Sequence, residues 1–336
     1  MPRLRYDEIH KLWVIFAPDR SQRPTDYAKP PTPEIVGECP FCPGNERQTP
    51  PEKYSLRRND SKPDTPGWDI RVVPNKFPAL VESEEKGLVE SDFEKSIGGF
   101  GVHEVIVDTP EHSADIPDMP LNQIAGMLKT YRMRLRELES DDRFEYIQIF
   151  RNFGYNAGET FSHPHSQLIT LPVIPSIVLT EIEAGFAHFN RKQSCLFCDT
   201  IKHEIDSSAR VIVRNDKFLV FAPYASRLPF EICVMPVRHS YNFSDISDDE
   251  ALSLAEALKN SLTSLQNVTG GVDYNILIHS LTHTYVKENR SPEAVYHWHF
   301  EILPRLTKAA GFEIGTGFGI NSVLPESAAG ILRENL

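Results

Sequence analysis

Short hydrophobic runs, separated by polar and turn-forming residues, predict a series of β-strands along this chain. In the first half they fall at 12–17, 70–73, 102–107 and 144–150, and another apolar stretch follows residue 165. In the second half they fall at 211–213, 218–222, 230–235, 273–279 and 297–303.

Two longer segments have the spacing of amphipathic helices. The segment 121–139 carries apolar residues three or four apart, and the segment 248–266 opens with Ser247 and Glu250 in a capping-box pattern. Helical segments are also expected within 171–194, where the two halves of the chain meet, and at 325–335.

The order strand, strand, helix, strand, strand occurs in both halves and predicts an internal duplication. The fold class expected is α+β, with helices packed on antiparallel sheets. We assign residues 1–175 to an N-terminal half and 190–336 to a C-terminal half, joined into one compact body.

Composition narrows the classes of protein. The chain has 336 residues and a net charge of −12, which argues against broad nucleic-acid binding but permits a small anionic substrate held by a few arginines. No apolar stretch is long enough for a membrane helix, and the N-terminus lacks the apolar core of a signal peptide. We therefore expect a cytoplasmic protein with no membrane partner.

A cysteine pair followed by a histidine pair occurs twice in the chain. Cys39 and Cys42 precede the motif His163-Pro164-His165, and Cys195 and Cys198 precede His297-Trp298-His299. In a reducing compartment such CxxC pairs bind metal or perform redox chemistry. Metal is favoured because neither pair opens an obvious helix after a strand, and the two thiolates favour Zn²⁺.

The first predicted zinc site takes two ligands from Cys39 and Cys42 and a third from His163. His112 and His103 are the candidates for the fourth ligand. His112 is favoured, since it lies in a loop from which a side chain can reach across, whereas His103 begins a strand.

The second predicted zinc site repeats this pattern with Cys195, Cys198, His239 and His297. His239 follows a strand, as His112 does. The remaining candidates are His279, His283 and His299. A structural role is expected, because tetrahedral sites with four cysteine or histidine ligands leave no open position.

His165 is the candidate nucleophile, because a neutral imidazole held in one tautomer attacks phosphorus well. Gln167 falls on the same face of the strand and can donate to a phosphoryl oxygen, and Ser166 can add a donor from its hydroxyl or backbone. Glu301 occupies the position of Gln167 in the second copy. A carboxylate repels phosphate, so that copy is expected to be silent.

The HPHSQ motif with an upstream CPFC resembles the galactose-1-phosphate uridylyltransferase branch of the histidine-triad superfamily. The resemblance covers nearly the whole chain and includes 13–24, 73–80, 103–107 and 311–317. It implies two histidine-triad-like halves, usually dimerised, and a ping-pong reaction. In that reaction a nucleotide sugar passes its nucleoside monophosphate to histidine, and a phosphate acceptor then removes it.

The resemblance assigns roles to individual residues. It matches His165 to the nucleophile, Gln167 to the phosphate-binding glutamine, and His112 to the first zinc site. It also implies substrate contacts from a wider set of polar residues: Arg20, Arg23, Asn75, Asn152, Thr160 and Glu313. The implied partners are a nucleotide sugar, a sugar 1-phosphate and a second copy of the chain.

The sequence departs from the best-known uridylyltransferases at Ser166, where they have glycine, and after Glu313, where it lacks their glutamine. The second Cys₂His₂ set is also not universal among them. These features resemble the ADP-glucose phosphorylase branch. We expect a UDP-glucose–hexose-1-phosphate uridylyltransferase of galactose metabolism, with adenylyl transfer from ADP-glucose to phosphate as the alternative. A histidine-triad nucleotide hydrolase is less favoured because Gln167 replaces the third histidine.

Overall fold

One antiparallel sheet runs through the whole molecule. The computed structural model describes residues 2–18, 38–57, 60–82, 87–288 and 292–336, so the predicted substrate contacts Arg20 and Arg23 lie outside the described residues. The ten strands, in their order across the sheet, are β10 (Val211–Arg214), β11 (Phe218–Phe221), β12 (Ile232–Pro236), β14 (His299–Pro304), β13 (Tyr274–His279), β8 (Tyr146–Phe153), β9 (His165–Leu171), β7 (His103–Val107), β4 (Trp68–Pro74) and β3 (Tyr54–Arg57).

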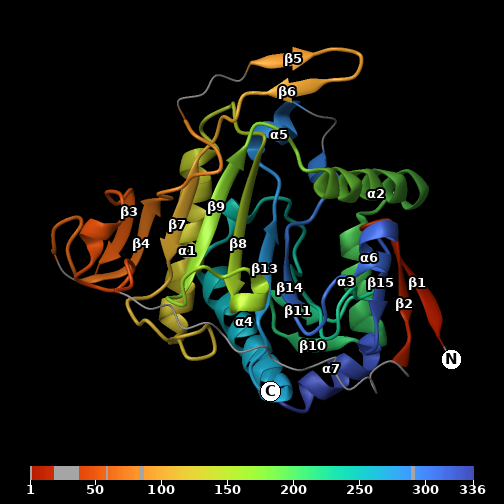
Figure 1. The fold of residues 1–336 in the computed structure, drawn as a ribbon. Coiled ribbons are helices and arrows are strands. Elements are labelled where there is room, and N and C mark those ends of the chain that lie inside the picture. The colour runs from red at the N-terminus through yellow and green to blue at the C-terminus, as the bar shows by residue number, and fades with distance from the viewer. Residues whose placement is uncertain (1, 19–37, 58–59, 83–86, 289–291) are drawn as a thin grey trace.

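The sheet consists of two similar halves that meet where β8 pairs with β13. On one side β9 lies between β8 and β7, and on the other β14 lies between β13 and β12. The two HxH motifs therefore occupy equivalent strands, β9 and β14, on either side of the junction (Figure 1). This arrangement is the duplication that the order of elements predicts.

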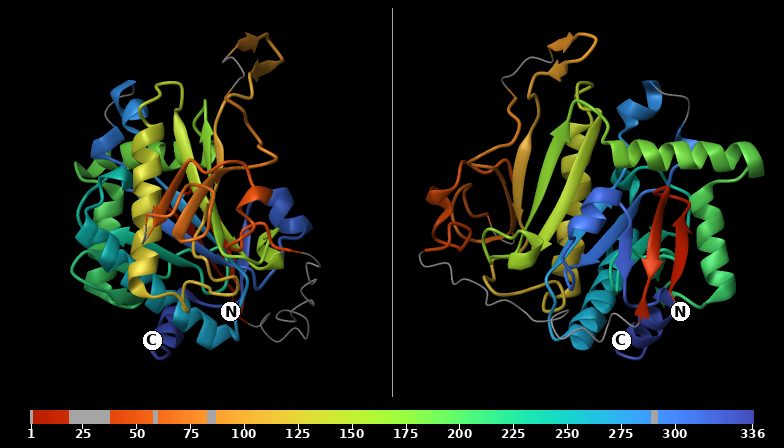
Figure 2. Two further views of the ribbon diagram at one scale, coloured as in Figure 1. Left: turned by 90° about the vertical axis from the view of Figure 1, so that its left-hand side faces the viewer. Right: turned by 45° about the vertical axis from the view of Figure 1, so that its right-hand side comes forward.

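Two helices, α1 (Leu121–Leu138) and α4 (Asp248–Thr269), cover one face of the sheet and bury their apolar sides in a common core. Figure 2 shows α1 lying along one side of the strands. Ser247 and Glu250 form the predicted capping box, which satisfies backbone amides that otherwise lack partners in the first turn of α4. The opposite face of the sheet, toward the viewer in Figure 1, is free of these two helices.

The remaining elements surround the sheet. A three-stranded sheet joins the N-terminal hairpin to a strand near the C-terminus, and a two-stranded arm projects from the body (Figures 1 and 2). These strands are β1 (Arg3–Asp7), β2 (Leu12–Phe16) and β15 (Gly319–Asn321), and in the arm β5 (Leu88–Glu90) and β6 (Lys95–Ile97). The other helices are α2 (Ser176–Lys192), α3 (Leu196–Ser207), α5 (His283–Glu288), α6 (Gly311–Thr316) and α7 (Pro325–Arg333), and the short 3₁₀ turns are η2 (Glu46–Gln48), η3 (Tyr155–Ala157), η4 (Phe243–Asp245) and η5 (Pro292–Ala294).

The structure confirms the mixed helix and antiparallel-sheet fold and each expected strand and helix, with ends shifted by a few residues. The second CxxC pair lies at the start of a helix, because Cys195 is the N-cap residue of α3, but helix α2 precedes it, so this pair does not open a helix after a strand. One feature differs from expectation. The N-terminal hairpin pairs with β15 and so joins the second half. Among the described helices, none is long and apolar enough to span a membrane.

Candidate functional site

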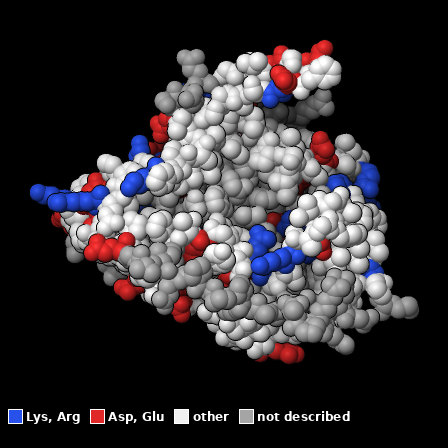
Figure 3. Space-filling view, viewed as in Figure 1, with Lys and Arg blue, Asp and Glu red and all other residues white. Residues whose placement is uncertain are grey.

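The alternation of side chains along β9 places its residues on two different faces. Ser166 is fully buried, and its hydroxyl meets that of Tyr131 on α1. His165 and Gln167 therefore point to the opposite, open face. Seen from that side, the surface is hollowed near its middle, and Lys and Arg side chains lie at the lower edge of the hollow (Figure 3). Such a hollow suits a polyanionic ligand.

The four residues predicted as the first metal site lie together. Ligand atoms of Cys39, Cys42, His112 and His163 all fall within 4.8 Å of one another. The Cys42 Sγ atom is 3.3 Å from Nδ1 of His112 and 3.6 Å from Nδ1 of His163. His112 thus joins the group, whereas His103 lies on β7 and makes other contacts.

The chemistry of this donor set fits a divalent cation. Burial and the neighbouring Cys39 thiol raise the pKa of Cys42 to about 11, so two bare thiolates do not coexist here at neutral pH. A cation bound between the two sulfur atoms offsets the repulsion between their negative charges, so that both can be thiolates. The outer nitrogen of His163, Nε2, donates to the carbonyl oxygen of Thr109 at 2.8 Å, which leaves Nδ1 as the ligand atom.

His165 is held through the residue two positions earlier. Its Nδ1 donates to the carbonyl oxygen of His163 at 2.9 Å, so the free lone pair lies on Nε2. Burial lowers the pKa of His165 to about 4, which keeps the ring neutral at pH 7. The ring of Phe41, from the CPFC segment, packs against it with 5.3 Å between centroids.

The side chains of Gln167 and Asn152 lie on the same face of the sheet as this imidazole. Gln167 lies two residues along β9, and its register partner on β8 is Phe150, two residues before Asn152. Both amides therefore share the face of His165. Ser166 does not, because its hydroxyl donates to Asp108 at 3.0 Å. Strand alternation directs this hydroxyl into the core. A substrate contact from Ser166, through its hydroxyl or its backbone, stays a prediction.

The other predicted contacts are less uniform. Asn75 lies next to His103, with 3.1 Å between Nδ2 and the ring Nε2, and Thr160 is exposed three residues before His163. The carboxylate of Glu313 accepts the backbone amide of Ala310 and caps α6, and no contact described for it reaches His165.

The second predicted metal group also comes together, with ligand atoms of Cys195, Cys198, His239 and His297 within 4.8 Å. Nε2 of His297 donates to the carbonyl oxygen of Pro236 at 2.8 Å, and Nδ1 of His299 donates to that of His297 at 3.1 Å. Each contact repeats one in the first half. The duplication therefore extends from the order of strands to the hydrogen bonds of the imidazoles.

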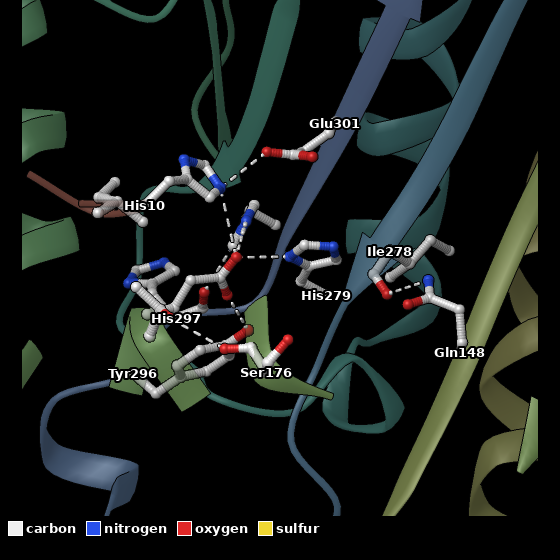
Figure 4. A network of polar contacts seen from close by, with 12 residues as sticks. His10, Gln148, Ser176, Ile278, His279, Tyr296, His297 and Glu301 are labelled. Atoms are coloured by element: carbon white, nitrogen blue, oxygen red, sulfur yellow. Dashed lines mark hydrogen bonds and ion pairs between the residues drawn. The ribbon is translucent and has the colours of Figure 1, made fainter. Parts of the chain in front are cut away.

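The two halves differ around the second HxH motif, where the side chains of His10 and Glu301 point toward one another (Figure 4). The Glu301 carboxylate pairs with Arg227 at 2.8 Å and with Nε2 of His10 at 3.1 Å. Burial lowers the pKa of His10, but Asp7 raises it, and the net result lies well above the usual value. The counterpart of Gln167 is thus an internal ion-pair partner.

Sequence reasoning missed several members of this network. Glu181 accepts hydrogen bonds from Nδ1 of His279 and from the hydroxyl of Tyr296, each at 2.7 Å. Two further groups have the geometry to hold a metal ion: His10, His299 and Glu301, and Glu181, His279 and His299. No motif marks His10 or Glu181, because they reach the motif residues His299 and Glu301 from separate elements. His279 and His299 were predicted from the sequence only as alternative zinc ligands.

Known proteins resemble this chain along its whole length. Residues 1–175 match the N-terminal domain of galactose-1-phosphate uridyl transferase, and residues 181–335 match its C-terminal domain. An ADP-glucose phosphorylase from Arabidopsis thaliana is 35% identical over 99% of this chain and 93% of its own length. A galactose-1-phosphate uridylyltransferase from Thermotoga maritima is 29% identical, over 99% of this chain and 98% of its own.

A solved structure gives the same result. The crystal structure of an ADP-glucose phosphorylase from Arabidopsis thaliana with bound ADP-glucose has a TM-score of 0.84 and 34% identity, covering 99% of this chain and 98% of that one. The fold, the two family domains and the identity agree. The chain belongs to the galactose-1-phosphate uridyl transferase family of nucleotidyltransferases.

Proposed function

We propose that this protein transfers a nucleoside monophosphate from a nucleotide sugar to a phosphate acceptor through a covalent intermediate on His165. The reaction in the first instance is uridylyl transfer from UDP-glucose to galactose 1-phosphate, from which the family takes its name. One observation carries the proposal: Nδ1 of His165 is engaged by the His163 carbonyl, so Nε2 holds the lone pair on the open face.

The transfer has two displacements at the same phosphorus atom. Nε2 of His165 attacks the α-phosphorus, a P–N bond forms, and the P–O bond to the hexose 1-phosphate breaks. A phosphate oxygen of the acceptor then attacks that phosphorus, the P–N bond breaks, and the imidazole regains its lone pair. The neutral ring supports this route, because a protonated Nε2 has no lone pair.

We further propose that the two Cys₂His₂ groups each hold Zn²⁺. The ion would supply a structural anchor rather than an open catalytic position, because all four ligands come from the chain. Cys39, Cys42, His112 and His163 would hold the first ion. His163 then fixes the backbone carbonyl that orients His165.

A second candidate function is phosphorolysis of ADP-glucose, which yields ADP and glucose 1-phosphate through an adenylyl-histidine. Three observations favour it. The Arabidopsis relative with that name is more similar than the Thermotoga uridylyltransferase, 35% against 29% identity. The second Cys₂His₂ group is complete, and the segment after Glu313 lacks the glutamine that the best-known uridylyltransferases have there. ADP-glucose is therefore the first alternative donor to test.

Product analysis separates the two reactions. The protein is incubated with UDP-glucose and galactose 1-phosphate, and separately with ADP-glucose and inorganic phosphate. UDP-galactose from the first pair supports uridylyl transfer, and ADP with glucose 1-phosphate from the second supports phosphorolysis. Release of free UMP or AMP without acceptor would instead indicate a hydrolase and contradict both.

We also propose that the protein acts as a homodimer in the cytoplasm. Phe93 on the projecting arm is 97% exposed and Ile314 on α6 is 76% exposed, and burying such side chains against a second copy is favourable. All five cysteines are free, as a reducing compartment keeps them. Light scattering after gel filtration tests the dimer.

A further inference from the structure

Two amide side chains share the open face with His165, and each has a polar partner on the same face. Val105 of β7 is the register partner of Gln167, so His103, two residues earlier, lies on the face of Gln167. Asn275 of β13 is directly opposite Asn152. An amide donates from its nitrogen and accepts at its oxygen, so its orientation decides what a phosphate meets.

The orientation of Gln167 follows from a backbone amide that can only donate. The N–H of Ala79 donates to Nδ1 of His103 at 3.1 Å. A neutral imidazole with an accepting Nδ1 carries its proton on Nε2. That nitrogen lies 2.9 Å from Oε1 of Gln167, so the imidazole donates and the amide oxygen accepts. The Asn75 nitrogen, 3.1 Å from the same Nε2, faces a proton and forms no bond there.

The orientation of Asn152 follows from a guanidinium that can only donate. Nε of Arg305 donates to Oδ1 of Asn275, which fixes the amide of Asn275. Nδ2 of Asn275 then donates to Oδ1 of Asn152 at 2.7 Å and to the carbonyl oxygen of Ala157 at 2.8 Å. Asn275 is buried, so water does not compete for these contacts.

Both chains of hydrogen bonds end in the same way. The oxygens of Gln167 and Asn152 are occupied, and no described residue accepts a hydrogen bond from either amide nitrogen. We propose that His103 and Asn275 are positioning residues that present the NH₂ groups of Gln167 and Asn152 to the phosphoryl group under transfer. This inference rests on the proposed function, and it adds residues that touch neither substrate nor metal.

The expected size of the rate effect follows from the negative charge on the phosphoryl oxygens in the transition state. A donor aimed at that charge is worth about 10²- to 10³-fold in rate, and a group that orients such a donor is worth about 10- to 100-fold. An amide turned round would present its oxygen to the phosphate and lose more than an amide deleted. Reversing the direction of the hydrogen bonds that orient these amides is therefore the sharpest test.

His103→Gln and His103→Glu are a matched pair of variants that test the hydrogen bond from His103 to Gln167. Glutamine keeps a donor for Oε1 of Gln167, whereas glutamate offers only an acceptor and turns the amide round. The readout is the single-turnover rate of nucleotidyl adduct formation with UDP-glucose and with ADP-glucose, alongside zinc content and melting temperature. We expect H103Q to recover most of the wild-type rate and H103E to lose about 10- to 100-fold.

The same variants are then made in a Gln167→Ala background. If His103 acts through Gln167, H103E has no further effect there, which is a coupling that a general structural role or charge repulsion would not produce. Equal losses in both backgrounds, or equal rates for H103Q and H103E, would overturn the proposal. The second comparison holds even if the alanine variant is too slow to measure.

Asn275→Asp tests the hydrogen bonds that orient Asn152. A carboxylate accepts from both Arg305 and Asn152, so the amide of Asn152 turns round to donate to it. The rate should fall about 10- to 100-fold in the native background and not at all with Asn152→Ala. Asn267→Asp, an exposed change of the same charge on α4, is the control and should leave the rate unchanged. A wild-type protein with no adduct would refute the proposed function, whereas an adduct without coupling refutes only this inference.

Discussion

The carbonyl oxygen of His163 accepts a hydrogen bond from Nδ1 of His165 at 2.9 Å, while Nδ1 of the same His163 lies 3.6 Å from the sulfur of Cys42. One residue thus belongs to the metal group by its ring and to the nucleophile by its backbone. His163 therefore links the CxxC motif, through its ring, to the second histidine of the HxH motif, through its backbone. This connection predicts that the state of the first metal group controls the nucleophile.

Losing the first metal group should impair transfer more than losing the second. Cys42→Ser removes a ligand next to His163, whereas Cys198→Ser removes the equivalent ligand next to His297. We expect both variants to lose one metal ion and some stability, because metal binding contributes to folding. The rate should fall about 10- to 100-fold only in Cys42→Ser. Metal analysis and turnover measured on folded protein would contradict this if the two variants lost activity equally.

The second half should form no nucleotidyl adduct. Glu301 pairs with Arg227 and His10 where Gln167 stands in the first half, so charged side chains occupy the position a phosphate would need. We expect one adduct per chain, and His299→Asn should leave its rate within a few-fold. Intact mass with saturating nucleotide sugar measures the number, and peptide mapping locates it. Two adducts per chain, or one on His299, would disprove the assignment.

Ser166→Ala should destabilise the fold more than it slows the chemistry. The Ser166 hydroxyl donates to Asp108 at 3.0 Å within the core, and its loss removes one donor from a buried carboxylate. The expected cost is about 1–3 kcal/mol of unfolding free energy. Denaturant unfolding measures it, with the exposed Ser113→Ala as control. A normal stability with a large loss of rate would contradict this expectation and point to a substrate contact of Ser166.

Glu139 should make the protein less stable as the pH rises. Burial raises the pKa of this carboxyl from 4.5 to about 7, so the folded state holds a proton that the unfolded state releases. Stability then falls as pH rises from about 4.5 to about 7, by roughly 2 to 3 kcal/mol. Glu139→Gln should flatten this dependence, and the exposed Glu111→Gln should not. The free energy of unfolding is measured at pH 5 and pH 8 for the wild type and both variants. An equal change between the two pH values in all three proteins would contradict the assignment.

The sequence predicts those features that a local pattern or a repeated motif carries. The periodic apolar residues of α1, the capping box of α4 and the two cysteine–histidine groups lie where the patterns indicate. Alternation along β9 was also sufficient to direct Ser166 inward once His165 and Gln167 face outward, a consequence that the motif alone obscures.

Contacts that depend on the register of distant strands could not be predicted from the sequence. Asn275 reaches Asn152, and His103 reaches Gln167, because strands far apart in the chain lie side by side in a particular alignment. The same holds for His10, which enters the second half from the N-terminal hairpin to meet Glu301. A one-residue change of register would reverse which face each side chain occupies, and no motif reports it.

The covalent role of His165 can be tested by the intact mass of the protein after brief incubation with UDP-glucose or ADP-glucose in the absence of acceptor. We predict one added UMP or AMP per chain, located on His165, absent in His165→Gly, and lost on adding galactose 1-phosphate or phosphate. His165→Gly should keep its fold and metal content, since the metal ligand is His163. No adduct from either donor, or an adduct that persists in His165→Gly, would contradict the covalent role of His165.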